Sequence, residues 1–274
     1  MSGSRDVPRR ARWAGHAGAG ALLVGLTWAS PAAGADLPEV KAQGVLRVII
    51  AADESPDTFA LTASARPGFE REIMEKFCQR AGVRLDVVRA PGYADRIPML
   101  LRGDGDVIAA IFDTPDRREK VAFTVEVIPT HNVAVTIPPR ASIRRLEDLA
   151  ALRVGVIRGT KPAEAALEAG VKPHDLVTYT KIEDLLRALK AGEIGAAVLP
   201  VSELALASKR IAGLEAGITV GAAGTVAWAV RKEDTTLRAA MDDFLAGLRK
   251  SPSWNRLVVQ YFGDQALSVL GRAR

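Results

Sequence analysis

Cysteine, histidine and aromatic residues are scarce in this chain of 274 residues. It holds one cysteine and three histidines, and Phe, Trp and Tyr together make up 5% of the residues. A single cysteine cannot close an intramolecular disulfide, and we expect Cys78, which lies in a helical pattern, to be a small buried hydrophobe. His16, His131 and His174 stand far apart and show no metal-ligand spacing. The sequence therefore predicts neither a disulfide framework nor a metal or other cofactor.

A strong excess of charge is also missing once the N-terminus is set aside. The formal net charge is +5, and four arginines against one aspartate in residues 1–35 supply +3 of it. The remainder of the chain is close to neutral. Because nucleic-acid binding needs an extended basic surface, this balance gives no reason to expect a nucleic-acid partner.

The N-terminal residues have the pattern of an export signal. An uncharged stretch rich in Ala, Gly and Leu covers residues 13–30, and Ala33-Gly34-Ala35 fits the small-x-small pattern of a secretory cleavage site. Only residues 22–28 are strongly apolar, whereas a membrane-spanning helix needs about 20 such residues. We predict a signal peptide over residues 1–35, cleaved after Ala35, and a periplasmic protein. A membrane anchor is the alternative, and the export route stays open.

After residue 44, β-branched runs alternate with helical patterns. Strand and helix patterns alternate over residues 45–52, 69–82, 83–90, 94–105 and 107–112, and the alternation resumes over residues 132–210. Such an order is typical of a parallel α/β sheet. No low-complexity linker separates the blocks, which favours domains joined by several chain crossings.

Four segments, in order, resemble the signature of the family 3 periplasmic solute-binding proteins, the amino-acid-binding class. They are GFEREI at 68–73, the run from GDGDVI through TPDR to VAFT at 103–124, LAALRVGVIRGT at 149–160, and the closing segment at 226–263. The resemblance spans about residues 37–263. Each segment alone is weakly specific, and their order and spacing carry the resemblance.

The resemblance implies an α/β fold of the periplasmic binding protein-like II type. Two α/β lobes would be joined by two hinge strands, with the ligand in the cleft between them. Lobe 1 would comprise residues 36–130 plus 223–274, and lobe 2 residues 131–222. The hinges would lie near residues 128–133 and 222–227.

Arg117 is the first candidate ligand-binding residue. It follows a buried strand and a turn, so its guanidinium can reach the edge of a cleft and offer two parallel donors to a carboxylate. The matching arginine does this in the family that the chain resembles. The alternative is a solvated charge within the polar run 113–120.

A second candidate site lies where a strand meets a helix, at Gly159-Thr160-Lys161. Free backbone N–H groups at a helix start favour an anion. Thr160 can add a hydroxyl and Lys161 a positive charge, although Gly159 can equally serve only a tight turn.

Two further candidates come from the resemblance alone. Asp53 stands where several members carry an acid that meets a basic ligand side chain, and Phe59 resembles an aromatic residue near the cleft. Turn capping by Asp53 and a core position for Phe59 are the alternatives.

Departures from the family pattern concern specificity. Members that bind α-amino acids usually carry an aspartate where this chain has Pro200, and an ammonium group buried there would lack its partner. Ala110 and Phe112 stand where small or hydroxylated residues are common, and Asp113 is a substitute acceptor for an ammonium group. We therefore expect a cleft that is more apolar than a standard amino-acid site.

These observations predict a monomeric, non-catalytic binding protein. It would capture a small anionic or zwitterionic ligand, an amino acid or an organic acid, and deliver it to an inner-membrane ABC permease. The alternatives are a periplasmic accessory or sensor protein without a transporter, and an enzyme that resembles cyclohexadienyl dehydratases. In that enzyme Glu70 or Asp113 would be the acid–base group.

Overall fold

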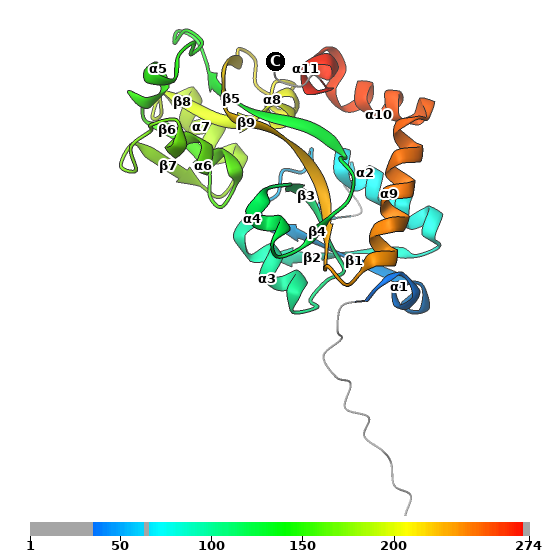
Figure 1. Cartoon of the computed structure of the whole chain (residues 1–274). Coiled ribbons are helices and arrows are strands. Elements are labelled where there is room, and N and C mark those ends of the chain that lie inside the picture. The colour runs from blue at the N-terminus through cyan, green and yellow to red at the C-terminus, as the bar shows by residue number, and fades with distance from the viewer. Residues whose placement is uncertain (1–34, 63–65, 271–274) are drawn as a thin grey trace, which may run out of the picture. The chain divides into compact units, whose positions relative to one another are not determined.

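The computed structural model describes residues 35–62 and 66–270 (Figure 1). The strands in these ranges are β1 (Val45–Ala51), β2 (Arg84–Ala90), β3 (Val107–Phe112), β4 (Ala122–Phe123), β5 (Ile128–Thr136), β6 (Val154–Ile157), β7 (Leu176–Tyr179), β8 (Ala196–Pro200) and β9 (Glu215–Val230). The helices are α1 (Leu37–Gln43), α2 (Phe69–Ala81), η1 (Tyr93–Asp95), α3 (Arg96–Leu101), α4 (Pro115–Arg118), α5 (Leu146–Ala150), α6 (Lys161–Glu168), α7 (Ile182–Ala191), α8 (Val201–Ala207), α9 (Thr235–Arg249), α10 (Pro252–Phe262), η2 (Gly263–Gln265) and α11 (Ala266–Leu270).

The strands form one sheet in the order β2-β1-β3-β9-β5-β8-β6-β7, with β4 also paired to β9. Strands β1, β2 and β3 are parallel to one another, and so are β6, β7 and β8. Between these two sets run β5 and β9, which pair antiparallel to each other and to their neighbours. The two parallel sets are the predicted α/β blocks, and the long pair β5–β9 connects them (Figure 1).

The strands and helices lie close to where their sequence patterns predict them. Helix α2 ends at Gly82, whose φ of 74° is the left-handed conformation that glycine adopts at helix ends. The main difference is β9, which begins at Glu215 rather than near residue 225. Its first half contains glycines and alanines, which have low strand propensity. Gly217 is required there, because a Cβ atom would meet the carbonyl oxygen of Ile143 at 2.3 Å.

Apolar cores lie on each side of the central strand pair. Helices α2, α9 and α10 pack aromatic side chains against β1, β3 and β9, and the rings of Phe77, Phe244 and buried Trp228 all contact one another. Cys78 lies in this core, as its helical pattern predicts, and burial raises the pKa of its thiol to about 12. Around β6 and β8, smaller aliphatic clusters form with α6 and α7. Helix α8 contacts both sides, since Leu204 packs on the second core and Leu206 on the first.

The two predicted hinge segments lie side by side in the β5–β9 pair. Residues Ile128 to Thr130 pair with Val226 to Gly224, and the register shifts between Thr130 and Asn132. An irregularity at this point bends a strand pair locally. The lobe boundaries themselves stay a prediction.

The predicted signal peptide lies outside the described residues except for its last residue. Ala35 is buried, and its backbone N–H donates to the Asp106 carboxylate at 3.4 Å. The Asp36 carboxylate accepts the backbone N–H of Leu237 at 2.7 Å and so caps the start of α9. Over the ranges that the structure describes, none of the helices combines the length and apolarity needed to cross a bilayer.

Candidate functional site

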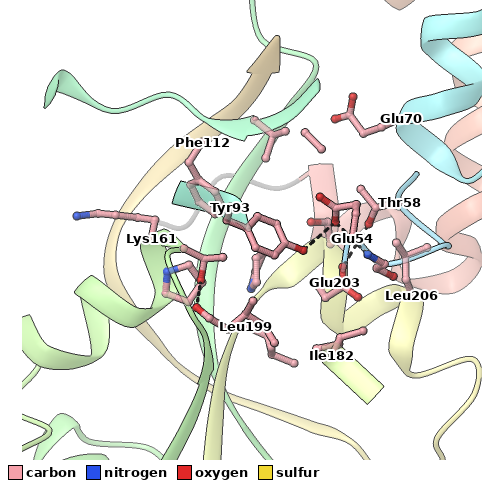
Figure 2. Close-up of a pocket in the computed structure, with 18 of the residues that line it drawn as sticks. Glu54, Thr58, Glu70, Tyr93, Phe112, Lys161, Ile182, Leu199, Glu203 and Leu206 are labelled. Carbon is pink, nitrogen blue, oxygen red and sulfur yellow. Dashed lines mark hydrogen bonds between the residues drawn. The ribbon is translucent and has the colours of Figure 1, made fainter. Parts of the chain in front are cut away.

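A cavity of about 110 Å³ lies between the two halves of the sheet. Its walls come from the loop after β1, from α2, η1, β3 and α4 on one side, and from the segments β6–α6 and β8–α8 on the other. A single water molecule needs roughly 10–15 Å³ by the same kind of measure. The cavity can therefore hold a small organic molecule or several waters (Figure 2).

Arg117 places a positive charge in the wall of this cavity. It lies in the short helix α4, which begins after Thr114, and its Nη1 donates to the carbonyl oxygen of Phe112 at 2.9 Å. Burial, and next the charge of Arg96, lower the pKa of the Arg117 guanidinium. Among the described residues it forms no ion pair with a carboxylate. The guanidinium of Arg117 therefore lines the cavity without a carboxylate partner among the described residues.

Arg96 is a buried cation that supports the backbone beside the half-buried Arg117. Its Nη1 donates to the carbonyl oxygens of Ala109 and Ala110 at 3.1 and 3.2 Å, where the pairing of β3 shifts register. Ala110 has a φ of 51°, an uncommon conformation for a residue with a side chain. Arg96 thus holds a strained turn of the cavity wall in place, with its guanidinium over the Tyr93 ring.

Carboxyl groups from both sides also line the cavity. Glu54, from the loop after β1, accepts hydrogen bonds from its neighbour Ser55 N at 3.1 Å and from the Tyr93 hydroxyl at 3.2 Å. Burial raises the pKa of Glu54, and the charge of Arg96 partly offsets this effect. Glu203, in the first turn of α8, accepts a hydrogen bond from Thr58 at 3.3 Å. Burial, and then repulsion from Glu54, raise the pKa of Glu203 to about 7.

Glu70, in the first turn of α2, is the most buried of these acids, with 2% of its surface exposed. Its Oε2 accepts the Trp228 indole N–H at 2.9 Å, whereas Oε1 has no hydrogen-bond partner in the described part of the chain. Burial raises the pKa of Glu70 to about 7, and the charge of Glu54 adds to the rise. Figure 2 shows its carboxylate pointing from α2 toward the cavity residues.

Several contacts close the cavity between the two halves of the sheet. Asp57 and Arg210 form an ion pair at 3.0 Å. Tyr93 packs against the aliphatic cluster of β6, β8 and α7. A Cβ atom on Gly159 would lie only 3.3 Å from the backbone nitrogen of Ala94. These contacts link the two sides of the cavity.

The predicted site residues fall into two groups. Arg117, Thr160, Lys161, Ala110, Phe112 and Pro200 all line the cavity. Two of them are already engaged, because the Thr160 hydroxyl donates to the Ile157 carbonyl at 2.6 Å and the Lys161 ammonium bonds Glu164 at 3.0 Å. The Lys161 nitrogen accordingly points away from the other cavity residues (Figure 2).

Gly159, Asp53, Phe59 and Asp113 do not line the cavity. Phe59 is fully buried in the core beside α2, which is the alternative that the sequence left open. Asp113 pairs with Arg118, with 2.6 Å between Nε and Oδ1, so it is not free to receive a ligand ammonium group. Gly159 has a φ of 73° and serves the turn before α6.

Sequence reasoning missed four titratable residues of the wall: Glu54, Tyr93, Arg96 and Glu203. Glu54 directly follows the candidate Asp53, and Glu203 lies three positions after Pro200. The prediction of a cleft more apolar than an amino-acid site is therefore incomplete. Glu203 supplies an acid about one helical turn after Pro200, the position compared with the family's aspartate. No group of three His, Cys, Asp or Glu side chains in residues 35–62 and 66–270 is placed to hold a metal ion.

Sequence comparison finds relatives among longer proteins. The chain is 28% identical to the membrane-bound lytic murein transglycosylase F of Stutzerimonas stutzeri over 86% of its length, which is 49% of that relative. The corresponding protein of Ectopseudomonas mendocina is 30% identical over 86% of the chain and 49% of its own length. The chain thus spans about half the length of these curated relatives.

Solved structures with the same fold are amino-acid-binding proteins. Holo ArgBP from T. maritima is 27% identical, with a TM-score of 0.68 over 82% of this chain and 99% of that one. An ancestral amino-acid-binding protein, a precursor of cyclohexadienyl dehydratase, is 23% identical and has a TM-score of 0.74 over 82% and 99% of the two chains. This second likeness concerns the fold alone. Together they confirm the predicted periplasmic binding protein-like II fold.

The four sequence segments, the paired central strands and the cavity between the two halves of the sheet agree with one family assignment. The profile of the bacterial extracellular solute-binding proteins, family 3, matches residues 46–264. The chain belongs to this family of solute-binding proteins.

Proposed function

We propose that this protein captures a small carboxylate-bearing ligand, an amino acid or an organic acid, in the cavity and delivers it to an ABC-type uptake system. One observation carries the proposal: the Arg117 guanidinium lines the cavity and forms no ion pair among the described residues. A buried charge is costly unless it is paired. A ligand carboxylate would supply the pair with two parallel hydrogen bonds.

The proposed lobes follow the predicted boundaries, residues 36–130 plus 223–274 and residues 131–222. The separate apolar cores on the two sides of β5–β9 support this division. Ligand binding would close the lobes by bending that strand pair near the register shift between Thr130 and Asn132. Gly159, Thr160 and the start of α6 would add backbone N–H donors near the carboxylate.

The proposed location is the periplasm, after export and removal of residues 1–35. The extracellular solute-binding family supports export. The proposed partner is an inner-membrane ABC permease, as for the solved amino acid ABC transporter substrate-binding protein from Streptococcus pneumoniae, which is 20% identical with a TM-score of 0.71. The protein would act as a monomer.

A second candidate function rests on the sequence relatives. Because they are named membrane-bound lytic murein transglycosylase F, the protein is alternatively an accessory binding protein for soluble peptidoglycan fragments, without a permease. We propose no catalytic role for Glu70 or Asp113. Conversion of prephenate or arogenate by the purified protein would contradict that part of the proposal.

A thermal-shift screen of amino acids, organic acids and peptidoglycan fragments tests these functions. A ligand at about 100 times its dissociation constant adds about 2.7 kcal/mol to the unfolding free energy. We expect the shift to disappear in Arg117→Ala and to persist in Arg118→Ala, whose guanidinium is exposed and paired with Asp113. A carboxylate-dependent shift that survives Arg117→Ala would contradict the proposed site.

A further inference from the structure

The charges around Arg117 determine which kind of carboxylate its guanidinium can bind. The charges that act on it are those of Arg96, Glu164 and Asp116. Both of these acids are exposed and neither lines the cavity, and Glu164 is already paired with Lys161 at 3.0 Å. The charge that acts on Arg117 from the cavity wall is therefore that of Arg96, which is itself a cation.

Backbone carbonyl groups of the cavity wall near Arg117 are also engaged. The carbonyl oxygen of Phe112 accepts Nη1 of Arg117 at 2.9 Å, and that of Ala110 accepts Nη1 of Arg96 at 3.2 Å. On the facing segment, the carbonyl oxygen of Ile157 accepts a side-chain hydroxyl at 2.6 Å. Because a guanidinium already contacts two of these oxygens, an ammonium group beside them would meet positive charge.

The three glutamates that line the cavity do not supply a counter-ion at this place. Glu54, Glu70 and Glu203 each accept a hydrogen bond from another side chain of the protein. None of the three is among the charges that act on Arg117. Burial raises the pKa of all of them, to about 7 for Glu70 and Glu203, and so favours their uncharged forms. The cavity therefore tolerates a carboxylate but offers little to a cation beside it.

An α-ammonium group is attached to the carbon next to the carboxylate, so it must lie close to Arg117 whenever the carboxylate binds there. Asp113 does not help, because its carboxylate is paired with Arg118 and it does not line the cavity. Over the residues that the structure describes, no carboxylate both lines the cavity and acts on the Arg117 charge. A buried cation without a partner is costly. A hydroxyl, a keto oxygen or a hydrogen atom in its place avoids this cost.

Apolar side chains from both halves of the sheet form another part of the cavity wall. Strands β5 and β9 contribute Ile128 and Val226, and β6 and β8 contribute Ile157 and Leu199. A ligand that fills the space between them gains free energy in proportion to the apolar area it buries, about 25 cal/mol per Å². Polar groups placed there would lose their hydration without a partner. The body of the ligand is therefore apolar.

We propose, building on the proposed function, that the ligand is a monocarboxylate without an α-ammonium group, whose aliphatic or aromatic body occupies the apolar part of the cavity. Arg117 binds the carboxylate. Arg96 acts as a specificity-determining residue, because it adds positive charge and engages the carbonyl oxygen of Ala110. The substrate class is therefore α-hydroxy, α-keto and unsubstituted carboxylic acids, rather than α-amino acids.

Calorimetric titration with pairs of probes that differ only at the α-carbon tests this inference. The pairs are L-leucine and L-α-hydroxyisocaproate, L-phenylalanine and L-phenyllactate, and L-alanine and L-lactate. A hydroxyl and an ammonium group are similar in size, so each pair isolates the effect of the charge. We expect the hydroxy acid of at least one pair to bind about tenfold tighter or more than its amino acid, because an unpaired charge is the costliest group to bury. Isocaproate, which has no α-substituent, should also bind more tightly than leucine.

Two variants show where the preference arises. Arg117→Ala should abolish the binding of every hydroxy acid. In Asp113→Asn the preference should stay within about twofold, since Asp113 lies outside the cavity wall and surface substitutions have small effects. If Asp113→Asn weakens only the amino acid, Asp113 is an ammonium acceptor and the inference is wrong.

The outcomes separate this inference from the proposed function. Equal or tighter binding of the amino acid in every pair would overturn the inference, and loss of that binding in Arg117→Ala would leave the proposed function standing. If no member of any pair binds but another carboxylate of the screen binds through Arg117, the inference fails and the proposed function again stands. If no carboxylate binds in a manner that depends on Arg117, both fail.

Discussion

The two ends of the cavity hold buried charges of opposite sign, and the fold maintains them differently. At one end the single guanidinium of Arg117 is fixed by a hydrogen bond to the Phe112 carbonyl and keeps its charge. At the other end the charge of Glu54 raises the pKa of Glu70 and of Glu203, and burial favours the neutral forms of all three carboxyl groups. One end thus carries a permanent charge, whereas burial favours the uncharged forms of the carboxyl groups at the other.

Removing the permanent charge should have the largest effect on binding. In Arg117→Ala the binding free energy of a carboxylate ligand should fall by about 2–5 kcal/mol, the range for truncating one partner of a buried charge pair. The thermal stability of the free protein should not fall, because the guanidinium has no carboxylate partner among the described residues. Calorimetric titration and unfolding of the same samples check both statements. An equal loss of binding free energy in Arg118→Ala would contradict the assignment of the carboxylate to Arg117.

The second prediction concerns how stability depends on pH through Glu203, one of the carboxyl groups that line the cavity. The folded pKa of Glu203 is about 7, above its ordinary value of 4.5. Stability from this group is complete below about pH 4.5 and is lost as the pH rises through 7, by an amount on the order of 3 kcal/mol. Unfolding of the ligand-free protein between pH 5 and pH 8 should therefore show a decline, and Glu203→Gln should flatten it. A profile unchanged by this substitution would mean that Glu203 is ionised in the free protein.

The third prediction separates the charge of Glu70 from its hydrogen bond. In Glu70→Ala the buried Trp228 N–H loses its acceptor, which should cost about 1–3 kcal/mol of unfolding free energy. Glu70→Gln keeps an acceptor oxygen and should lose much less. Denaturant unfolding followed by tryptophan fluorescence measures both variants. Similar losses in the two would show that the charge, and not the hydrogen bond, is what the core requires.

The smallest effect on stability is expected for the ion pair between Asp57 and Arg210. Asp57 and Arg210 link the two walls, but each side chain is 38% exposed. Asp57→Asn should therefore lower the unfolding free energy by no more than about 1 kcal/mol, and added salt should reduce the difference. Unfolding at low and high salt checks this prediction. A larger loss that does not depend on salt would contradict this prediction and would show that the Asp57–Arg210 ion pair contributes substantially to holding the two walls together.

The two ends also differ in how far the sequence could predict them. Arg117 lies in a short motif next to a buried strand, so its place at the cavity follows from local order along the chain. The carboxyl groups of the cavity belong to residues 54, 70 and 203, which are far apart in the sequence. They line one cavity because of how the loop after β1, α2 and α8 pack. No local pattern encodes that packing. Glu203 lies three residues after Pro200, about one helical turn beyond the position that carries an acid in members of the family.

Most of the fold could be predicted because hydrophobic periodicity is a local signal. The strands and helices from Val45 to Phe112 follow it closely. The first half of β9 could not be predicted, because Gly217 and its glycine and alanine neighbours lack the β-branched pattern of a strand. Their place in the sheet is set by contacts with β5 and with the backbone of Ile143.

The most direct test of the account is a thermodynamic cycle on Arg117 and the ligand carboxylate. The most stabilising carboxylate of the screen and its primary amide are titrated into the unmodified protein and into Arg117→Ala. The account predicts that loss of the carboxylate and loss of the guanidinium are not additive, since both remove one interaction, with a coupling of about 1.5 kcal/mol or more. Independent, additive losses would show that the carboxylate binds elsewhere and would contradict the proposed site.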